Sequence, residues 1–262
     1  MHIWYLSDLH LEERDYDLEI VGWCPPHASV LVLAGDVGNG AAGVQWANRQ
    51  AEVLGLPVIF VPGNHDFFDV YGTDLQALLG RMKTAAAPGV HVLYNERIEI
   101  RGVTFLGATL WTDFAYSEHA WTSEQDLMRA ASTFPDFSLI NVEGDLLTPE
   151  TWVRLHQEAR DWLESELISL QDRDAGPRVV VTHHLPHPRS LDPRHRGSDT
   201  DAAFCSRLPD ALLGLADAWI HGHSHHAQDW RGPGGVHVVS NPLGYPGEGR
   251  APGFERPQWV TV

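Results

Sequence analysis

The chain contains five short apolar runs that each end in polar, turn-prone residues. These runs are "IWYLSDLH" (3–10), "VLVLAGD" (30–36), "VIFVPGNHD" (58–66), "RVVVTHH" (178–184) and "AWIHGHSH" (218–225). Continuous runs of β-branched and aromatic residues are typical of strands that are buried on both faces of a sheet. Two further runs, "VTFLGATL" (103–110) and "VHVVS" (236–240), predict strands without such a cluster of acid and imidazole groups.

Apolar positions that recur with a 3.6-residue period predict helices between these strands. The period is clearest over 148–170, where Thr148 can cap the helix and Pro149 suits its first position. Shorter helical patterns cover 41–54, 73–86 and 119–131. Strands that alternate with helices predict an α/β fold with crossover connections and a largely parallel or mixed sheet.

Length and composition indicate one globular domain over residues 1–262, because no internal repeat, low-complexity segment or long linker interrupts the pattern. Stretches rich in Pro, Gly and His at 183–199 and 241–257 predict surface loops, the second of them ordered or partly mobile. No apolar run approaches the roughly 18 to 20 residues that cross a bilayer. The opening residues "MHIWYLSDLH" lack the basic leader of a secretory signal, so we expect a cytoplasmic protein without membrane partners.

The net charge of −17 limits the partners further. Sequence-independent binding to nucleic acid needs a basic face that releases counterions, so this charge argues against it. One phosphate held by metal ions stays compatible, because a pair of cations dominates the field at short range. Cys24 and Cys205 form no CxxC pair, which predicts reduced thiols rather than disulfides or a thiolate metal site.

The polar residues at the five strand ends are oxygen and imidazole donors. In open α/β sheets, ligands bind beyond the carboxyl ends of the strands, so one rim can gather all of them. Such donors without thiolate suit Mn, Fe, Zn, Ni or Mg sites better than structural zinc. Taken singly, an Asp here is usually a turn or capping residue, and Asn64 fits an Asx turn, so the prediction depends on the whole series.

The series "DLH", "GD", "GNHD", "THH" and "GHSH" resembles the calcineurin-like metallophosphoesterase superfamily, whose blocks read D-x-H, G-D, G-N-H-D/E, H and G-H-x-H. The resemblance implies a four-layer α/β/β/α sandwich of two mixed sheets flanked by helices, with a two-metal site on one rim. It implies hydrolysis of a phosphomonoester or phosphodiester, with a small phosphorylated molecule or nucleotide as the substrate.

The resemblance also implies a role for each block. Seven residues would bind the metals: Asp8, His10 and His225 the first, Asn64, His183 and His223 the second, and Asp36 both. Two cations about 3.5–4 Å apart share a hydroxide, lower its pKa and neutralise phosphoryl charge during in-line displacement. His65 would donate a proton to the leaving group. Asp66 would orient its imidazolium, or would only cap or hydrogen-bond within the turn. We expect Mn²⁺ with Fe or Zn, with Ni or Mg also compatible.

Within "HGHSHH" (221–226), only His223 and His225 match the last block, so His221 and His226 would be bystanders that could at most support the ligands. Gly222 would allow a sharp exit from the preceding strand.

Candidates for substrate contact have a weaker signal. His184, in the loop after the fourth strand, would line the pocket or only fill the loop. Asp113, in "LWTDF", follows a strand, with a packed aromatic turn as an equal alternative. Arg189 and Arg194 would contact non-bridging phosphate oxygens through a bidentate pair of N–H groups, or would be ordinary solvated arginines.

Two other functions compete with the phosphoesterase of a small molecule. A non-catalytic scaffold of the same fold would be expected to have lost ligands, and none is lost here. A protein phosphatase remains an alternative, although nothing marks the characteristic extended sequence. In the lipid A precursor hydrolases of the superfamily an Arg usually replaces the His of the third block, so His65 counts against that assignment. The oligomeric state is not readable from the sequence.

Overall fold

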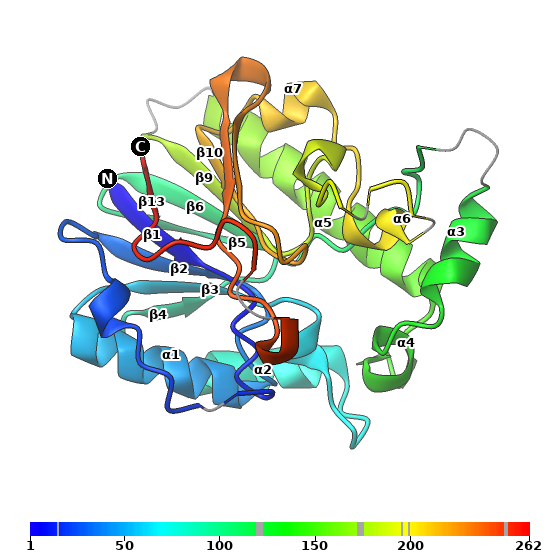
Figure 1. The fold of residues 1–262 in the computed structure, drawn as a ribbon, viewed down its shortest axis with the longest axis horizontal. Helices are drawn as coiled ribbons and strands as arrows, with labels where there is room; N and C mark the ends of the chain where they lie inside the picture. Colours follow the sequence, from blue (N-terminus) through cyan, green and yellow to red (C-terminus); the bar gives the residue numbers. More distant parts are fainter. Residues whose placement is uncertain (15, 119–122, 172–175, 195, 199, 249–250) are drawn as a thin grey trace.

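The computed structural model describes residues 1–14, 16–118, 123–171, 176–194, 196–198, 200–248 and 251–262. Two mixed sheets stack face to face, with helices on the two outer faces (Figure 1). The first sheet has the strand order β13-β1-β2-β3-β4 and the second has the order β11-β12-β10-β9-β6-β5. The predicted four-layer α/β/β/α sandwich is confirmed.

Both sheets are parallel in the middle and antiparallel at an edge. In the first sheet the parallel strands are β1 (His2–Leu6), β2 (Val30–Ala34), β3 (Val58–Val61) and β4 (Val90–Val92), and β13 (Trp259–Thr261) pairs antiparallel with β1. In the second the parallel strands are β6 (Val103–Ala108), β9 (Arg178–Thr182), β10 (Ala218–Ile220) and β12 (His237–Ser240), with antiparallel β5 (Glu96–Ile100) and β11 (Gln228–Arg231) at the edges. A separate hairpin joins β7 (Asn141–Val142) and β8 (Asp145–Leu146).

The strands are continuously apolar because both of their faces are covered. Alternate side chains of a strand point to opposite faces. In β1, Trp4 therefore packs in the core under the helices, while Tyr5 packs in the core between the sheets. Helices α1 (Ala41–Leu54) and α2 (Leu75–Ala85) cover the first sheet, and α5 (Pro149–Gln171) and α7 (Asp210–Leu213) cover the second (Figure 1).

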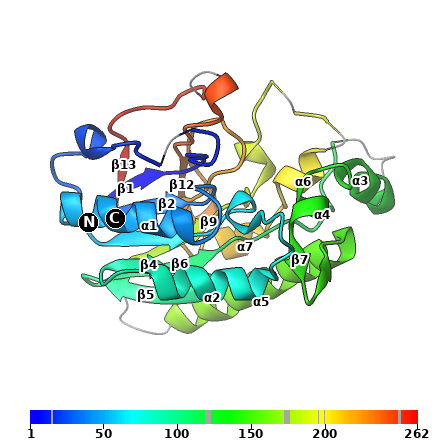
Figure 2. The same ribbon diagram turned by 90° about the horizontal axis from the view of Figure 1, so that it is seen from below.

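The two ends of the molecule differ. The chain termini lie side by side at one end, where the Val262 N–H donates to the Met1 carbonyl (Figures 1 and 2). The short helices α3 (Glu124–Ala131), α4 (Asp136–Leu139) and α6 (Asp201–Phe204) gather at the far end.

Three of the four predicted helices can be compared along their whole length. Those over 41–54 and 148–170 correspond to α1 and α5, and Thr148 Oγ1 accepts the N–H of Thr151 at 3.2 Å. The helix expected over 73–86 begins at Leu75, because the Asp74 carboxylate caps it by accepting the N–H of Gln76. The helix expected over 119–131 appears as α3, and its first positions, 119–122, lie outside the described residues.

Within their described residues, the two long predicted loops contain single turns of 3₁₀ helix at Pro188–Ser190 and Pro246–Glu248, and isolated β-bridges at Leu185 and Pro242. Both cysteines are free thiols. Among the described residues, no helix combines the length and apolar character that crossing a membrane requires.

Candidate metal centre and active site

The loops that follow β1, β2, β3, β9 and β10 converge on one rim of the sandwich. There the ligand atoms of Asp8, His10 and His225 lie within 4.8 Å of one another. Within the same limit lie a second group of Asp36, His183 and His223, and a third of His10, Asp36 and His65. Asn64 Oδ1 is 3.0 Å from His183 Nε2. All seven predicted ligands therefore lie together. Asp36 lies between two halves of the site, one with Asp8, His10 and His225 and the other with Asn64, His183 and His223.

Four of the five spacings between these atoms suit two ligands of one metal ion. A ligand bond of about 2.0–2.2 Å places two ligands of one ion about 3.0–3.5 Å apart. The observed separations are 3.0 Å for His10 Nε2 and His225 Nε2, 3.5 Å for His225 Nε2 and Asp8 Oδ1, 3.2 Å for His183 Nε2 and His223 Nδ1, 3.2 Å for His183 Nε2 and Asp36 Oδ2, and 3.9 Å for His10 Nε2 and Asp36 Oδ2. One oxygen of Asp36 thus faces both halves.

The backbone at the rim is strained. Five of the predicted ligands have positive φ: Asp8 (53°), His10 (45°), Asp36 (53°), His223 (71°) and His225 (46°). Such a conformation costs an ordinary residue on the order of 1–3 kcal/mol and persists only where the surrounding structure imposes it. Here it turns the chain sharply after each strand, so that the side chain points back to the rim.

Three glycines of the motif allow close packing. A Cβ atom would lie 2.1 Å from His183 Nδ1 at Gly35, 2.2 Å from Asp36 Oδ1 at Gly63, and 2.7 Å from Asp8 Oδ2 at Gly222. Each glycine directly precedes a predicted ligand. The expected reason for Gly222 is corrected. Its φ is not positive, so glycine stands there because a Cβ atom would not fit, and not because of its conformational freedom.

Three of the four histidines that are predicted ligands have an acceptor on the nitrogen that faces away from the centre. These contacts are His10 Nδ1 with Glu12 Oε1 (3.1 Å), His225 Nδ1 with Glu248 Oε2 (2.8 Å) and His183 Nδ1 with the Ala34 carbonyl (3.0 Å). Such partners fix the tautomer and leave Nε2 available to a metal. His223 differs: its Nδ1 faces the centre, and its buried Nε2 has no hydrogen-bond partner among the described residues.

The shared carboxylate stays ionised. Burial would raise the pKa of Asp36, but the charges of His183 and His65 outweigh it and hold the pKa well below its ordinary value. The reciprocal effect raises the pKa of His183 to about 9 against the effect of its burial. An ionised carboxylate oxygen can serve two cations at once, so Asp36, whose Oδ2 faces both halves, suits a bridging role.

His65 lies beside the ligands, and Glu12 orients it. Its Nδ1 is 3.3 Å from the same Glu12 oxygen that holds His10, and its Nε2 is 2.9 Å from the Tyr245 hydroxyl. Burial would raise the pKa of Glu12, but these two histidines lower it to about 2. No pattern in the sequence indicated Glu12, although it follows His10 by only two positions in "DLHLE".

The expected orienting role of Asp66 is not what the geometry shows. Its buried carboxylate accepts the backbone N–H groups of Asp36 (2.9 Å), Val37 (3.1 Å), Gly38 (3.0 Å) and Gly63 (2.7 Å). The side chain therefore ties together the loops after β2 and β3, which is the turn role given as its alternative. Burial and the charge of Asp36 raise the pKa of Asp66 to about 7, while its backbone hydrogen bonds lower it.

Asp136, which no pattern in the sequence indicated, orients Asn64. The Asn64 amide nitrogen donates to Asp136 Oδ1 at 2.8 Å. The amide oxygen therefore faces His183 and the centre. Asp136 lies on α4, far along the chain, so no local pattern connects it with Asn64.

The candidates for substrate contact are placed differently from the prediction. His184 is buried between the rings of Trp111 and Trp152, and burial together with the charge of His183 holds its pKa well below the ordinary value. It is a neutral packing residue behind His223 and does not line the cavity. Asp113 accepts the N–H of Ala115 at 3.1 Å, as in the packed-turn alternative.

Of the two arginines, only one reaches the site. Arg189 is exposed, lies over the Trp230 ring at 4.8 Å and donates to the Arg231 carbonyl, because Pro188–Ser190 turns it towards the outer strand β11. Arg194 does line the cavity, and its guanidinium donates to both oxygens of Asp192. Arg189 is thus removed from the candidates.

The histidines expected to be bystanders lie outside the ligand groups. His221 is buried, with Nε2 3.0 Å from Ser190 Oγ. His226 Nδ1 lies 2.8 Å from the side-chain amide nitrogen of Gln228.

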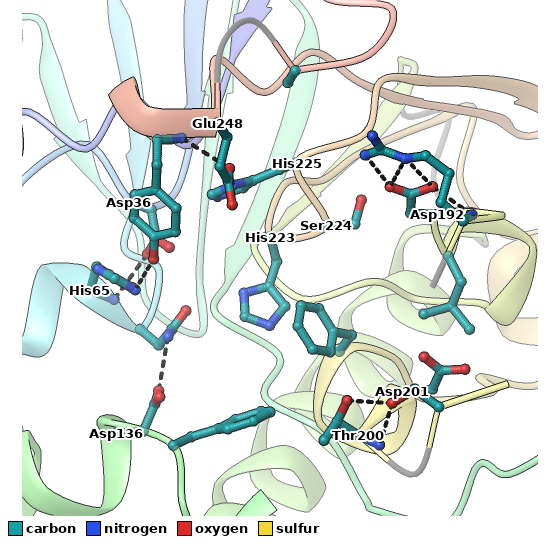
Figure 3. Close-up of a pocket in the computed structure, with 18 of the residues that line it drawn as sticks. Asp36, His65, Asp136, Asp192, Thr200, Asp201, His223, Ser224, His225 and Glu248 are labelled. Carbon is teal, nitrogen blue, oxygen red and sulfur yellow. Dashed lines mark hydrogen bonds and ion pairs between the residues drawn. The ribbon is translucent and has the colours of Figure 1, made fainter. Parts of the chain in front are cut away.

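A cavity of about 740 Å³ opens over the centre. Figure 3 shows Asp36, His65 and Glu248 on one side of it and Asp192, Thr200 and Asp201 on the other. Leu191 and Phe204 add apolar surface. The cavity leaves the candidate metal centre accessible to a molecule of moderate size.

Comparison with known proteins supports the family resemblance. Residues 1–227 match a family model described as calcineurin-like phosphoesterase. An uncharacterised protein of Acanthamoeba polyphaga mimivirus is 25% identical over 266 residues, which cover 92% of this chain and 90% of that protein.

Two solved structures share the fold. A phosphopantetheinyl hydrolase from Mycobacterium tuberculosis has a TM-score of 0.66 and 20% identity, over 94% of this chain and 90% of that one. A dimetal phosphatase from Danio rerio has a TM-score of 0.52 and 14% identity, over 92% of this chain and 86% of that one. At these identities the likeness shows the fold alone.

Proposed function

Because the chain belongs to the calcineurin-like phosphoesterase family and is a metal-dependent phosphoesterase, we propose that it hydrolyses a small phosphorylated molecule with two divalent metal ions. The observation that carries this proposal is the position of Asp36 between two groups of ligand atoms. The first ion would be held by Asp8, His10 and His225, the second by Asn64, His183 and His223, and both by Asp36.

The donor set fits such ions, because carboxylate, amide and imidazole donors suit Mn, Fe or Zn. We propose Mn²⁺ with Fe or Zn, and Ni or Mg would also be accepted. When bound, two such cations lower the pKa of water and neutralise phosphoryl charge. Asn64 is a neutral donor and leaves its ion more electrophilic, while Asp136 keeps the amide oxygen turned towards it.

His65 would supply the proton that the departing oxygen needs. Glu12 holds Nδ1, so the nitrogen that can carry this proton is Nε2, which lies 2.9 Å from the hydroxyl of Tyr245, another residue of the cavity wall. Burial would lower the pKa of His65, but the charges of Asp36 and Glu12 raise it above the ordinary value. A positioned acid with a pKa near the working pH is an effective proton donor.

The test is hydrolysis of p-nitrophenyl phosphate and bis(p-nitrophenyl) phosphate by the Mn²⁺-loaded protein. We expect release of p-nitrophenolate that a chelator stops and Mn²⁺ restores. His65→Ala should keep both metals in elemental analysis and lose about 10²–10⁴-fold in rate. If the metals are bound and neither ester nor a nucleotide panel is cleaved, the proposal is wrong. A metal content near zero under replete conditions would favour a non-catalytic scaffold.

A further inference from the structure

Two cavities meet at His65. The first is the 740 Å³ cavity over the candidate metal centre, and the second has a volume of about 660 Å³. His65, Pro135 and Tyr245 line both. The hydrogen bond between His65 Nε2 and the Tyr245 hydroxyl therefore joins two residues of the shared wall. A ligand that reacts beside His65 can extend from there in two directions.

The second cavity has the lining of a site for an uncharged organic group. The Phe68 ring packs against the His65 imidazole, with 4.2 Å between the ring centroids. The Val70 side chain, which also lines this cavity, is 79% exposed. Leu139 and Pro246 add apolar surface. Its described lining contains the acids Glu12, Glu13 and Asp69 but no Lys or Arg. Such a surface repels a phosphate group and accepts an aromatic or aliphatic one.

The first cavity offers little positive charge beyond the metal centre. Among its described lining residues the single Lys or Arg is Arg194, and both oxygens of Asp192 already accept from it. Asp201 and Glu248 add negative charge on opposite sides of the same cavity. A phosphomonoester dianion presents three non-bridging oxygens, whereas a phosphodiester presents one negative charge and two such oxygens. Repulsion by an acidic cleft therefore disfavours the monoester more.

We propose that the substrate is a phosphodiester whose two organic groups lie in the two cavities on either side of His65. This inference rests on the proposed function. A water oxygen bonds to phosphorus while the P–O bond to one alcohol breaks. The departing oxygen keeps the bond pair and takes the proton of His65 Nε2, and a proton from the water restores the imidazolium. The products are one alcohol and a phosphomonoester that keeps the other group.

The first test varies the second group at a constant leaving group. The substrates are p-nitrophenyl phosphate, the p-nitrophenyl ester of thymidine 5′-phosphate and bis(p-nitrophenyl) phosphate, with the Mn²⁺-loaded protein. Contacts in an apolar pocket are worth about 10–200-fold in kcat/KM, so we expect both diesters to exceed the monoester by at least about tenfold. A monoester cleaved equally well or better overturns the inference and leaves the proposed function standing. If no ester is cleaved while metals are bound, the proposed function itself fails.

The second test blocks the second cavity. A Cβ at Gly247, which lines it, has no atom within 4 Å, so Gly247→Trp can be accommodated and its ring can fill the space. Gly80 on α2 has the same open surroundings outside both cavities, and Gly80→Trp is the control. We expect Gly247→Trp to lower the diester-to-monoester ratio of kcat/KM by about tenfold, and the control to leave it unchanged.

A milder pair guards against a folding defect. Val70→Asp removes apolar surface at the second cavity, and Val53→Asp changes a comparably exposed valine (65%) on α1. We expect Val70→Asp to lower the diester-to-monoester ratio of kcat/KM and Val53→Asp to leave it unchanged. In the His65→Ala background, where turnover is slow, calorimetry should show weaker binding of bis(p-nitrophenyl) phosphate with Val70→Asp. An unchanged ratio and unchanged binding with both Val70→Asp and Gly247→Trp would overturn the inference.

Discussion

The two halves of the candidate metal centre are supported in different ways. In the half formed by Asp8, His10 and His225, both imidazoles are backed by carboxylates, which belong to Glu12 and Glu248. In the half formed by Asn64, His183 and His223, the backing groups are the Ala34 carbonyl and Asp136. The His223 Nε2 has no hydrogen-bond partner among the described residues.

We expect this difference to give the two ions different binding affinities. Carboxylates behind an imidazole increase its basicity, and outer partners of this kind change metal affinity by about 10–100-fold. The second half offers only neutral ligands besides the shared Asp36. We therefore expect its ion to be held more weakly and to act as the stronger Lewis acid.

The largest effect should follow from the residue that both halves share. Asp36→Asn removes the charge that two cations divide between them. We expect turnover to fall by at least about 10³-fold, roughly 4 kcal/mol in the barrier, together with loss of one or both ions in elemental analysis. Asp161→Asn, on the exposed side of α5, is the matched control. Two bound ions and a rate within tenfold of the original would contradict a bridging role.

The next effect should distinguish the halves directly. Titration with a chelator should remove the ions in two steps separated by about 10–100-fold in concentration, and turnover should vanish with the first step. His223→Ala should leave one tightly bound ion per chain, and His225→Ala one weakly bound ion. The measurement is residual metal per chain after dialysis. Release of both ions in one step, or an ion bound more tightly in His225→Ala than in His223→Ala, would contradict the expected difference in affinity between the two halves.

The sequence predicts much of this centre because its ligands follow buried strands directly. A strand covered by a helix layer on one face and a second sheet on the other must be apolar throughout, as Trp4 and Tyr5 of β1 illustrate. The edge strands β5, β11 and β13 were missed for the opposite reason, because many of their side chains are exposed. The residues of β5, "ERIEI", are exposed or half-buried, and their polar composition does not stand out from a loop.

The supporting residues could not be predicted, because loops bring them in from a distance. Tyr245 reaches His65 across 180 positions, and Asp136 reaches Asn64 across 72. Neighbours in sequence were also misleading. Asp66 directly follows His65, but the 3₁₀ turn from His65 to Phe67 sends the two side chains in different directions.

A smaller effect should come from a supporting carboxylate of the first half. Glu12→Gln keeps the size of the side chain but removes the negative charge that contacts the His10 and His65 rings. We expect affinity for the first ion to fall by about 10–100-fold and the second to change less. Asp136→Ala is the counterpart, since it frees the Asn64 amide and should weaken the second ion alone. Metal titrations of both variants measure the affinity for each ion. If both variants weaken binding of the same ion, the assignment of Glu12 to the first ion and Asp136 to the second is wrong.

The smallest effect should come from Glu248→Gln. Glu248 holds His225 much as Glu12 holds His10, but its side chain is 53% exposed, against 15% for Glu12. Water and salt screen an exposed charge, so its removal should cost only a few-fold in affinity for the first ion. The comparison is a metal titration of Glu248→Gln and Glu12→Gln at low and high ionic strength. If burial sets the contribution of an outer carboxylate, the effect of Glu248→Gln shrinks as salt is added while that of Glu12→Gln persists. Equal losses at both ionic strengths would show that the hydrogen bond to the imidazole matters and the burial of the charge does not.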